Sequence, residues 1–453
     1  GTWTQVSGPS TATIVTPSSP TTVINALNIA GTYVFQWSIA NAPCTASSDQ
    51  ISVIVKGIPT TANAGVDQTI CATGGSATMA GNTAASGAGT WTQVSGPVTA
   101  TITTPTSATT TITGMTTAGS YTFQWTIANA PCTATSDQMV VTVNPAPTTA
   151  NAGPDQTICV SSPSATMAGN TAAIGAGTWT QVSGPSTATI VTPSSPTTVI
   201  NALNTVGTYV FQWSIANAPC AASTDQISVI VKGIPTTANA GNPQTICATS
   251  GSATMAANAA VSGAGAWTQI SGPVTATITT PSSATTTITG MTTAGSYIFQ
   301  WTISNAPCTA SSSQVTITAA PGTTVANAGP DQTFCLSAVS TTLAANTPVN
   351  GTGAWSILAG SANTSTSQLS STTLTTATFT PTIAGTYILR WTISNNPCSA
   401  STDDVVITVQ PFAAAFAAVP LRLREASATL GMDPLRTFVR VILPLAWPGV
   451  LSG

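Results

Sequence analysis

The sequence predicts an all-β chain made of tandem β-sandwiches, and three observations lead to this prediction. A stretch of alternating apolar and polar residues at 119–132 returns with small changes at 31–44, 207–220, 295–308 and 385–398. Such period-two alternation is typical of a strand with one buried face. Each repeat of 88 residues holds about seven short runs of this kind, and none has helical periodicity. The chain therefore repeats one module whose strands bury their apolar faces against each other.

The repeat sets the predicted domain boundaries. We predict five β-sandwich repeats at 1–58, 59–146, 147–234, 235–322 and 323–410, followed by a short helical tail at 411–453. The first repeat is truncated, because Gly1-Thr-Trp matches residues 89–91 in the middle of the next one. We therefore expect the sequence to be a fragment of a longer protein.

The unit 59–146 shows the expected strands in chain order. They are 68–71, 76–80, 87–96, 100–104, 109–113, the repeated stretch and 137–143. A joint at 58–65 rich in Pro and Gly precedes the first strand, Pro97 ends the third, and β-branched Thr dominates the fourth and fifth. Seven short strands at this spacing are typical of a Greek-key sandwich of the immunoglobulin type.

The large apolar side chains of the unit are expected to form its structural core. Tyr121, Phe123, Trp125 and Ile127 alternate with polar residues in the repeated strand, and Trp91 lies midway along the third strand. An immunoglobulin-like sandwich buries such a Trp between its sheets and carries a Tyr near the start of its penultimate strand. The alternative is a sugar-stacking platform of Trp91 and Trp125, but alternating strands favour burial of both.

The nine cysteines form two series with the period of the repeat, and each complete unit holds one of each. Two pairings respect this period: within a unit, or across a linker as in Cys132 with Cys159. A whole strand and a linker separate the latter two, which favours the first pairing. We predict Cys71–Cys132, Cys159–Cys220, Cys247–Cys308 and Cys335–Cys398, with Cys44 unpaired. Paired cysteines at fixed positions favour an oxidising compartment.

Charge is scarce, and this limits the possible functions. Only 4% of residues are charged and there is no His, against about 25% charged residues in typical soluble domains. Without a basic patch, nucleic acid is not an expected partner. Asp67 and Asp137 are the carboxylates of the unit 59–146; we expect solvated turn residues, with a single calcium ion at a module joint as the alternative. We predict no catalytic, metal or cofactor site and no enzyme activity.

The opening of three units resembles that of PKD-like domains. The residues are Asn63-Ala-Gly-Val-Asp-Gln-Thr69 and its counterparts at 151–157 and 327–333, with Ala-Gly-Ser/Thr-Tyr downstream. The resemblance covers 1–410 and implies immunoglobulin-like modules of large secreted or cell-surface proteins of the Bacteroidota. The Trp-Asp-Phe-Gly-Asp-Gly signature of the best-known PKD domains is absent, and Pro243 replaces the Asp in the unit 235–322.

The tail resembles another family, the ABC transporter permeases. Glu425-Ala-Ser-Ala-Thr-Leu-Gly431, nine further residues and Val441-Ile-Leu-Pro444 match the pattern of their cytoplasmic coupling loop. The resemblance implies docking positions at Glu425, Ala426 and Gly431, with Pro444 closing the motif. The apolar runs of the tail are too short to span a bilayer. We expect an artefactual join that carries no transport activity.

Together these observations predict an extracellular or cell-surface array that acts as an adhesin-type stalk or spacer. Its expected partners are the neighbouring repeats of the same chain, and surface glycans or other proteins. One alternative is a carbohydrate-binding module array of a secreted hydrolase. Another is a subunit of an extracellular polymer, in which the truncated first unit accepts a strand from another chain.

Overall fold

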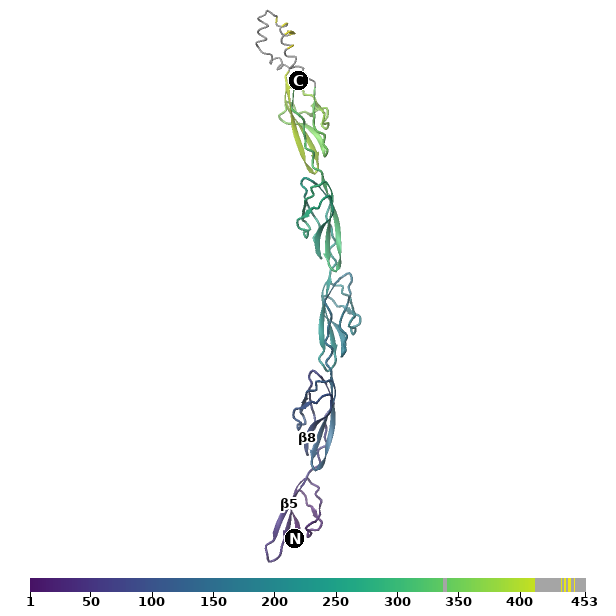
Figure 1. Ribbon diagram of the computed structural model, residues 1–453, viewed down its shortest axis with the longest axis vertical. Helices are drawn as coiled ribbons and strands as arrows, with labels where there is room; N and C mark the ends of the chain where they lie inside the picture. Colours follow the sequence, from purple (N-terminus) through teal and green to yellow (C-terminus); the bar gives the residue numbers. More distant parts are fainter. Residues whose placement is uncertain (337–339, 412–432, 434–435, 437–438, 441–443, 445–453) are drawn as a thin grey trace. The chain divides into compact units, whose positions relative to one another are not determined.

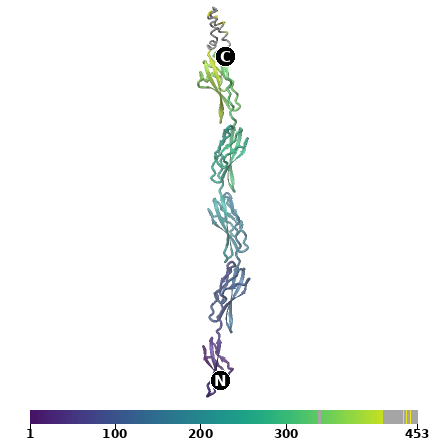
Figure 2. The same ribbon diagram turned by 60° about the vertical axis from the view of Figure 1, so that its left-hand side comes forward.

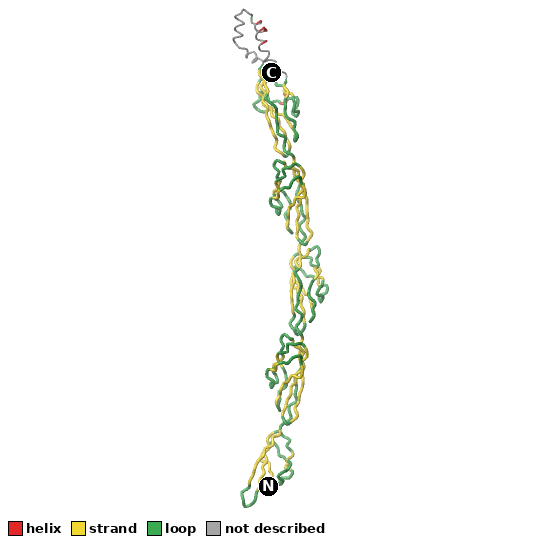
Figure 3. Tube along the Cα trace, viewed as in Figure 1, coloured by secondary structure: helices red, strands yellow, loops and turns green. Residues whose placement is uncertain are grey.

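The computed structural model describes residues 1–336, 340–411, 433, 436, 439–440 and 444 (Figures 1 and 2). Strands and loops alternate through the sandwich modules (Figure 3), which confirms the all-β prediction. The expected helical tail lies mostly outside the described residues and stays a prediction. Contacts divide the chain into two compact units, Gly1–Val231 and Lys232–Gly453, and each is described by itself.

The module at 59–146 contains all seven expected strands in two sheets. They are β6 (Gln68–Cys71), β7 (Ala77–Thr78), β8 (Ala88–Ser95), β9 (Thr101–Ile102), β10 (Thr111–Thr113), β11 (Gly119–Asn129) and β12 (Cys132–Asn144). The larger sheet has the order β6-β12-β11-β8 and the smaller one β7-β10-β9. The last strand begins at Cys132 instead of residue 137, because β11 and β12 form one long hairpin in which Asn129 pairs with Cys132.

The module at 147–234 repeats this order. Its strands are β13 (Gln156–Cys159), β14 (Ala165–Thr166), β15 (Ala176–Ser183), β16 (Thr189–Ile190), β17 (Val199–Asn201), β18 (Gly207–Ala216) and β19 (Ser223–Lys232). In the module at 1–58 the strands are β1 (Thr2–Ser7), β2 (Thr13–Ile14), β3 (Ile24–Asn25), β4 (Gly31–Ile39) and β5 (Ser47–Val55). The larger sheet of this module has the order β1-β4-β5.

The compact unit Lys232–Gly453 contains two more modules. The one at 235–322 has β20 (Gln244–Cys247), β21 (Ala253–Thr254), β22 (Ala264–Ser271), β23 (Thr277–Ile278), β24 (Thr287–Thr289), β25 (Gly295–Asn305) and β26 (Cys308–Ala320). The one at 323–410 has β27 (Gln332–Cys335), β28 (Thr341–Thr342), β29 (Thr352–Ile357), the 3-10 turn η1 (Thr366–Gln368), β30 (Thr378–Phe379), β31 (Gly385–Asn395) and β32 (Cys398–Gln410). The domain boundaries used here remain those expected from the sequence.

One apolar core lies between the two sheets of each module. In the module at 59–146, the side chains of Trp91, Tyr121, Phe123, Trp125 and Ile127 are all at most 2% exposed. The rings of Trp91 and Trp125 pack at a centroid distance of 5.1 Å. Their positions follow from strand alternation, because every second side chain of β8 and β11 points into the sandwich.

The first strand of the module at 59–146 pairs in parallel with its last strand. Gln68 of β6 lies opposite Val141 of β12, and Cys71 lies opposite Asn144. The same parallel pairing joins β20 to β26 and β27 to β32. The cysteine of the first strand therefore lies at the end of the module where the chain leaves for the next one.

Candidate functional site: the module joint

The disulfide pairing that we predicted from cysteine spacing is wrong. Cys71 is bonded to Cys220, and Cys247 to Cys398, each with a Cα–Cα distance of 4.9 Å. Cys159 and Cys308 are disulfide-bonded as well. The predicted bonds Cys71–Cys132, Cys159–Cys220, Cys247–Cys308 and Cys335–Cys398 therefore do not form, since each contains a cysteine bonded elsewhere. Cys44 and Cys132 are free thiols, the former exposed.

The parallel pairing of β6 with β12 explains the error. Cys71 lies beside the end of β12, whereas Cys132 is the first residue of this 13-residue strand. At ~3.4 Å per residue, the two cysteines are about 40 Å apart, far beyond the ~7 Å that a disulfide can bridge. We compared only partners within one unit or across one linker. A pairing with a sequence separation of 149 joins two successive modules instead.

The joint between the modules at 59–146 and 147–234 is built from a hairpin tip and a strand end. The tip between β18 and β19 reaches back, so that Cys220 Sγ lies 3.3 Å from the carbonyl oxygen of Pro145. Asn144 donates from Nδ2 to the oxygen of Ala218 at 2.7 Å, and Asn217 donates from Nδ2 to the oxygen of Pro145 at 2.8 Å. Two reciprocal hydrogen bonds therefore accompany the disulfide.

The linker of this joint is hydrogen-bonded to the module that it enters. The hydroxyl of Thr148 accepts from the backbone N–H groups of Ala173 and Ile174 at 3.0 and 2.9 Å. Further along, the N–H of Ala150 donates to the hydroxyl of Ser223 at 2.9 Å. Such bonds order a segment that would otherwise be a flexible Thr- and Ala-rich spacer.

The joint between the modules at 235–322 and 323–410 has the same construction. Asn395 donates from Nδ2 to the oxygen of Pro321 at 2.7 Å, and the hydroxyl of Thr323 donates to the oxygen of Ser399 at 2.8 Å. Cys398 Sγ lies 3.3 Å from the oxygen of Pro321, next to its bond with Cys247.

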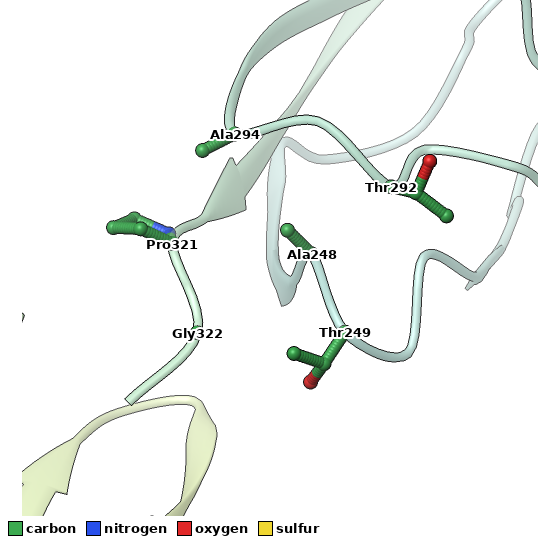
Figure 4. A pocket seen from close by; sticks show the side chains of 6 residues that line it. All are labelled: Ala248, Thr249, Thr292, Ala294, Pro321 and Gly322. Carbon is green, nitrogen blue, oxygen red and sulfur yellow. The ribbon is translucent and has the colours of Figure 1, made fainter. Parts of the chain in front are cut away.

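A hollow of about 510 Å³ opens beside this joint (Figure 4). It is lined by Ala248, Thr249, Thr292, Ala294, Pro321 and Gly322. These residues offer methyl groups and two hydroxyls, and none is charged or aromatic. The hollow therefore lacks the groups that catalysis needs and the anchors that usually fix a small molecule.

The joint before the module at 59–146 keeps the asparagine contact without a disulfide. Asn129 donates from Nδ2 to the oxygen of Gly57 at 2.8 Å, as Asn217 does one module later. The thiol of Cys132 lies 3.7 Å from the oxygen of Lys56. This thiol thus occupies the same position in its joint as Cys220 does in the next.

The carboxylates of the modules serve the backbone. Asp67 accepts from the N–H of Val140 at 2.8 Å, and Asp137 accepts from the N–H of Ala64 at 2.8 Å. The module at 235–322 has Pro243 and Ser313 at these two positions, so it lacks both carboxylates. Over the described ranges, no three His, Cys, Asp or Glu side chains gather as metal ligands would.

The tryptophan pair cannot act as a sugar platform. Trp91 and Trp125 are 1% and 2% exposed. Their Nε1 groups donate to the carbonyl oxygens of Ala108 and Asn82, both at 3.2 Å. Both rings are therefore enclosed by the module that carries them.

The permease-like motif falls largely outside the described residues. Glu425, Ala426 and Gly431 are not among them, and Pro444 is described as an exposed, isolated position. Within the described part of the chain, no helix has the length and hydropathy to cross a membrane.

Solved structures of repeat domains and one family model match parts of the chain. The structure is similar to Sidekick-1 immunoglobulin domains 1-5 (13% identity, 90% of this chain and 92% of that one, TM-score 0.32). It is also similar to the titin I-band fragment I67-I69 (15%, 58% and 99%, 0.35) and to the PKD domain from KIAA 1837 protein (28%, 18% and 85%, 0.17). No curated protein matches the sequence. A family model described as "PKD domain" matches 64–143, 152–231 and 240–319. These stretches make up just over half of the 453 residues, and the chain belongs to this PKD-domain family.

Proposed function

We propose that the chain is an extracellular or cell-surface structural array whose covalently locked joints make it a stalk or spacer. The bond between Cys71 and Cys220 carries this proposal, because it joins two successive modules. A disulfide within one module resists only the unfolding of that module. A disulfide between two modules also limits how far they can bend or turn about their joint.

The surrounding contacts support the same role. The reciprocal bonds of Asn144 and Asn217 hold the hairpin tip of one module against the strand end of the previous one. Hydrogen bonds along the linker add further restraints. Disulfides persist in oxidising surroundings, which supports an extracellular or cell-surface location.

Small-angle scattering of the whole chain tests the proposal. We expect Cys71→Ser together with Cys220→Ser to broaden the distribution of interatomic distances, because the joint then keeps only its hydrogen bonds. Cys44→Ser is the matched control, since its thiol is free and exposed. Identical scattering from the double variant and the control would remove the disulfide from the mechanism of the joint.

A further inference from the structure

The outer face of the larger sheet carries amide and hydroxyl side chains without any charge. In the module at 59–146, Gln124 of β11 lies opposite Gln138 of β12 and Thr92 of β8. The next row holds Thr126, opposite Ser136 and Thr90. We call Thr90, Thr92, Gln124, Thr126, Ser136 and Gln138 the amide–hydroxyl face; it lies on the side of the sheet away from the buried Trp pair.

The glutamine pair is ordered by its own hydrogen bonds. Gln138 donates from Nε2 to Oε1 of Gln124 at 2.9 Å, and Gln124 donates from Nε2 to the hydroxyl of Thr126 at 3.1 Å. Each carboxamide has two N–H donors and one carbonyl acceptor, so the pair leaves further donor and acceptor positions. Because the strands lie about 4.8 Å apart, these positions form regular rows on a stiff support.

The same pair recurs in three other modules. Gln50 donates to Gln36 at 2.8 Å, Gln226 to Gln212 at 3.0 Å and Gln314 to Gln300 at 3.0 Å. In the module at 323–410, Arg390 and Asp404 occupy this position in the register and form a two-pronged ion pair at 2.7 and 2.9 Å. The fold therefore accepts charges here, and folding alone does not explain four uncharged pairs.

We propose that the amide–hydroxyl faces of these four modules bind an uncharged polysaccharide. Neutral sugar hydroxyls both donate and accept hydrogen bonds, as the side chains of the face do, and they gain nothing from fixed charges. Each contact competes with water and is weak by itself. Four copies on one chain turn weak contacts into avidity. This inference is independent of the spacer role, because the faces lie away from the joints.

Electrophoresis of the full chain through gels containing dextran, hydroxyethyl cellulose or galactomannan tests the inference. The test variant copies the ion pair of the module at 323–410 into the other four. Its substitutions are Gln36→Arg, Gln50→Asp, Gln124→Arg, Gln138→Asp, Gln212→Arg, Gln226→Asp, Gln300→Arg and Gln314→Asp. We expect at least one of the three polymers to retard the parent chain, and the variant to lose at least tenfold in apparent affinity.

The smaller sheet supplies a control with the same change in charge. Its opposed pairs are Thr13 with Asn25, Thr101 with Thr113, Thr189 with Asn201 and Thr277 with Thr289. Arg at the first and Asp at the second residue of each pair should leave retardation unchanged. Thermal unfolding of both variants monitors the fold.

Three results would overturn the inference. The first is a parent chain that no uncharged polymer retards. The second is a folded test variant that is retarded like the parent. The third is concentration-dependent sedimentation of the parent that only the test variant loses, which would assign the face to a second copy of the chain.

Discussion

Removing one cysteine of a joint should lengthen the stretched chain by the whole segment that its disulfide encloses. When the two ends are pulled apart, tension passes directly from Cys71 to Cys220, and the residues between them bear none. Their sequence separation is 149. At about 3.5 Å per residue of extended chain, Cys71→Ser should add about 520 Å to the contour length.

Single-molecule force spectroscopy of the oxidised full chain measures this length, and Cys132→Ser is the control. Its thiol is free, so this variant should extend no further than the parent. If Cys71 were bonded within its own unit, to Cys132, both variants would instead release 61 residues, or about 210 Å. Equal gains for the two variants would therefore refute the joint-spanning bond.

Three more predictions follow from the contacts. Trp125→Ala should destabilise its module by about 3–5 kcal/mol in denaturant unfolding, because it leaves a large cavity in the core. Asp137→Ser should be tolerated, since the module at 235–322 has Ser313 at the equivalent position, at a cost of about 1–2 kcal/mol for the lost bond to a backbone N–H; added calcium should not change its melting temperature. The hydrogen bond from Arg390 lowers the pKa of Asp404, so this pair contributes stability above the ordinary carboxyl pKa of about 3.9 and loses it as the pH falls through the lower, folded-state pKa. Arg390→Gln should therefore flatten the acid limb of the unfolding curve.

Each of the three has a result that would contradict it. A Trp125→Ala chain with the parent's unfolding curve would mean that the ring is not part of the core. Calcium-dependent melting of the parent chain, lost in Asp137→Ser, would restore the metal site. Parallel acid unfolding of the parent and Arg390→Gln would show that the ion pair does not couple to folding, as is common for exposed pairs.

The fold could be predicted because its determinants are local. Alternation in the stretch from Tyr121 to Ile127 marks one buried face, and Pro97 and the Gly-rich turns mark strand ends. Seven strands and their core follow from such signals. Chain entry into the sandwich is not local, and nothing near Cys71 shows that β6 runs parallel to a strand about 70 residues later. The pairing of the cysteines depended on that one fact.

The amide–hydroxyl face could have been found from the sequence in part. Gln124 and Gln138 are 14 residues apart, and a hairpin centred between them places them side by side. The strand boundaries hid this, because the last strand was expected to begin at residue 137, with no register for the hairpin. The charge-free composition pointed to unusual surfaces but not to the sheet that carries them.

The bond between Cys71 and Cys220 also changes what a protease can do to the chain. It bypasses every peptide bond from residue 72 to residue 219. A single cut within this segment leaves both fragments attached to each other through the two sulfur atoms. The bond between Cys247 and Cys398 protects the segment 248–397 in the same way. Over these two stretches the chain can be nicked without being severed, and only a reductant acting together with a protease would release its distal end.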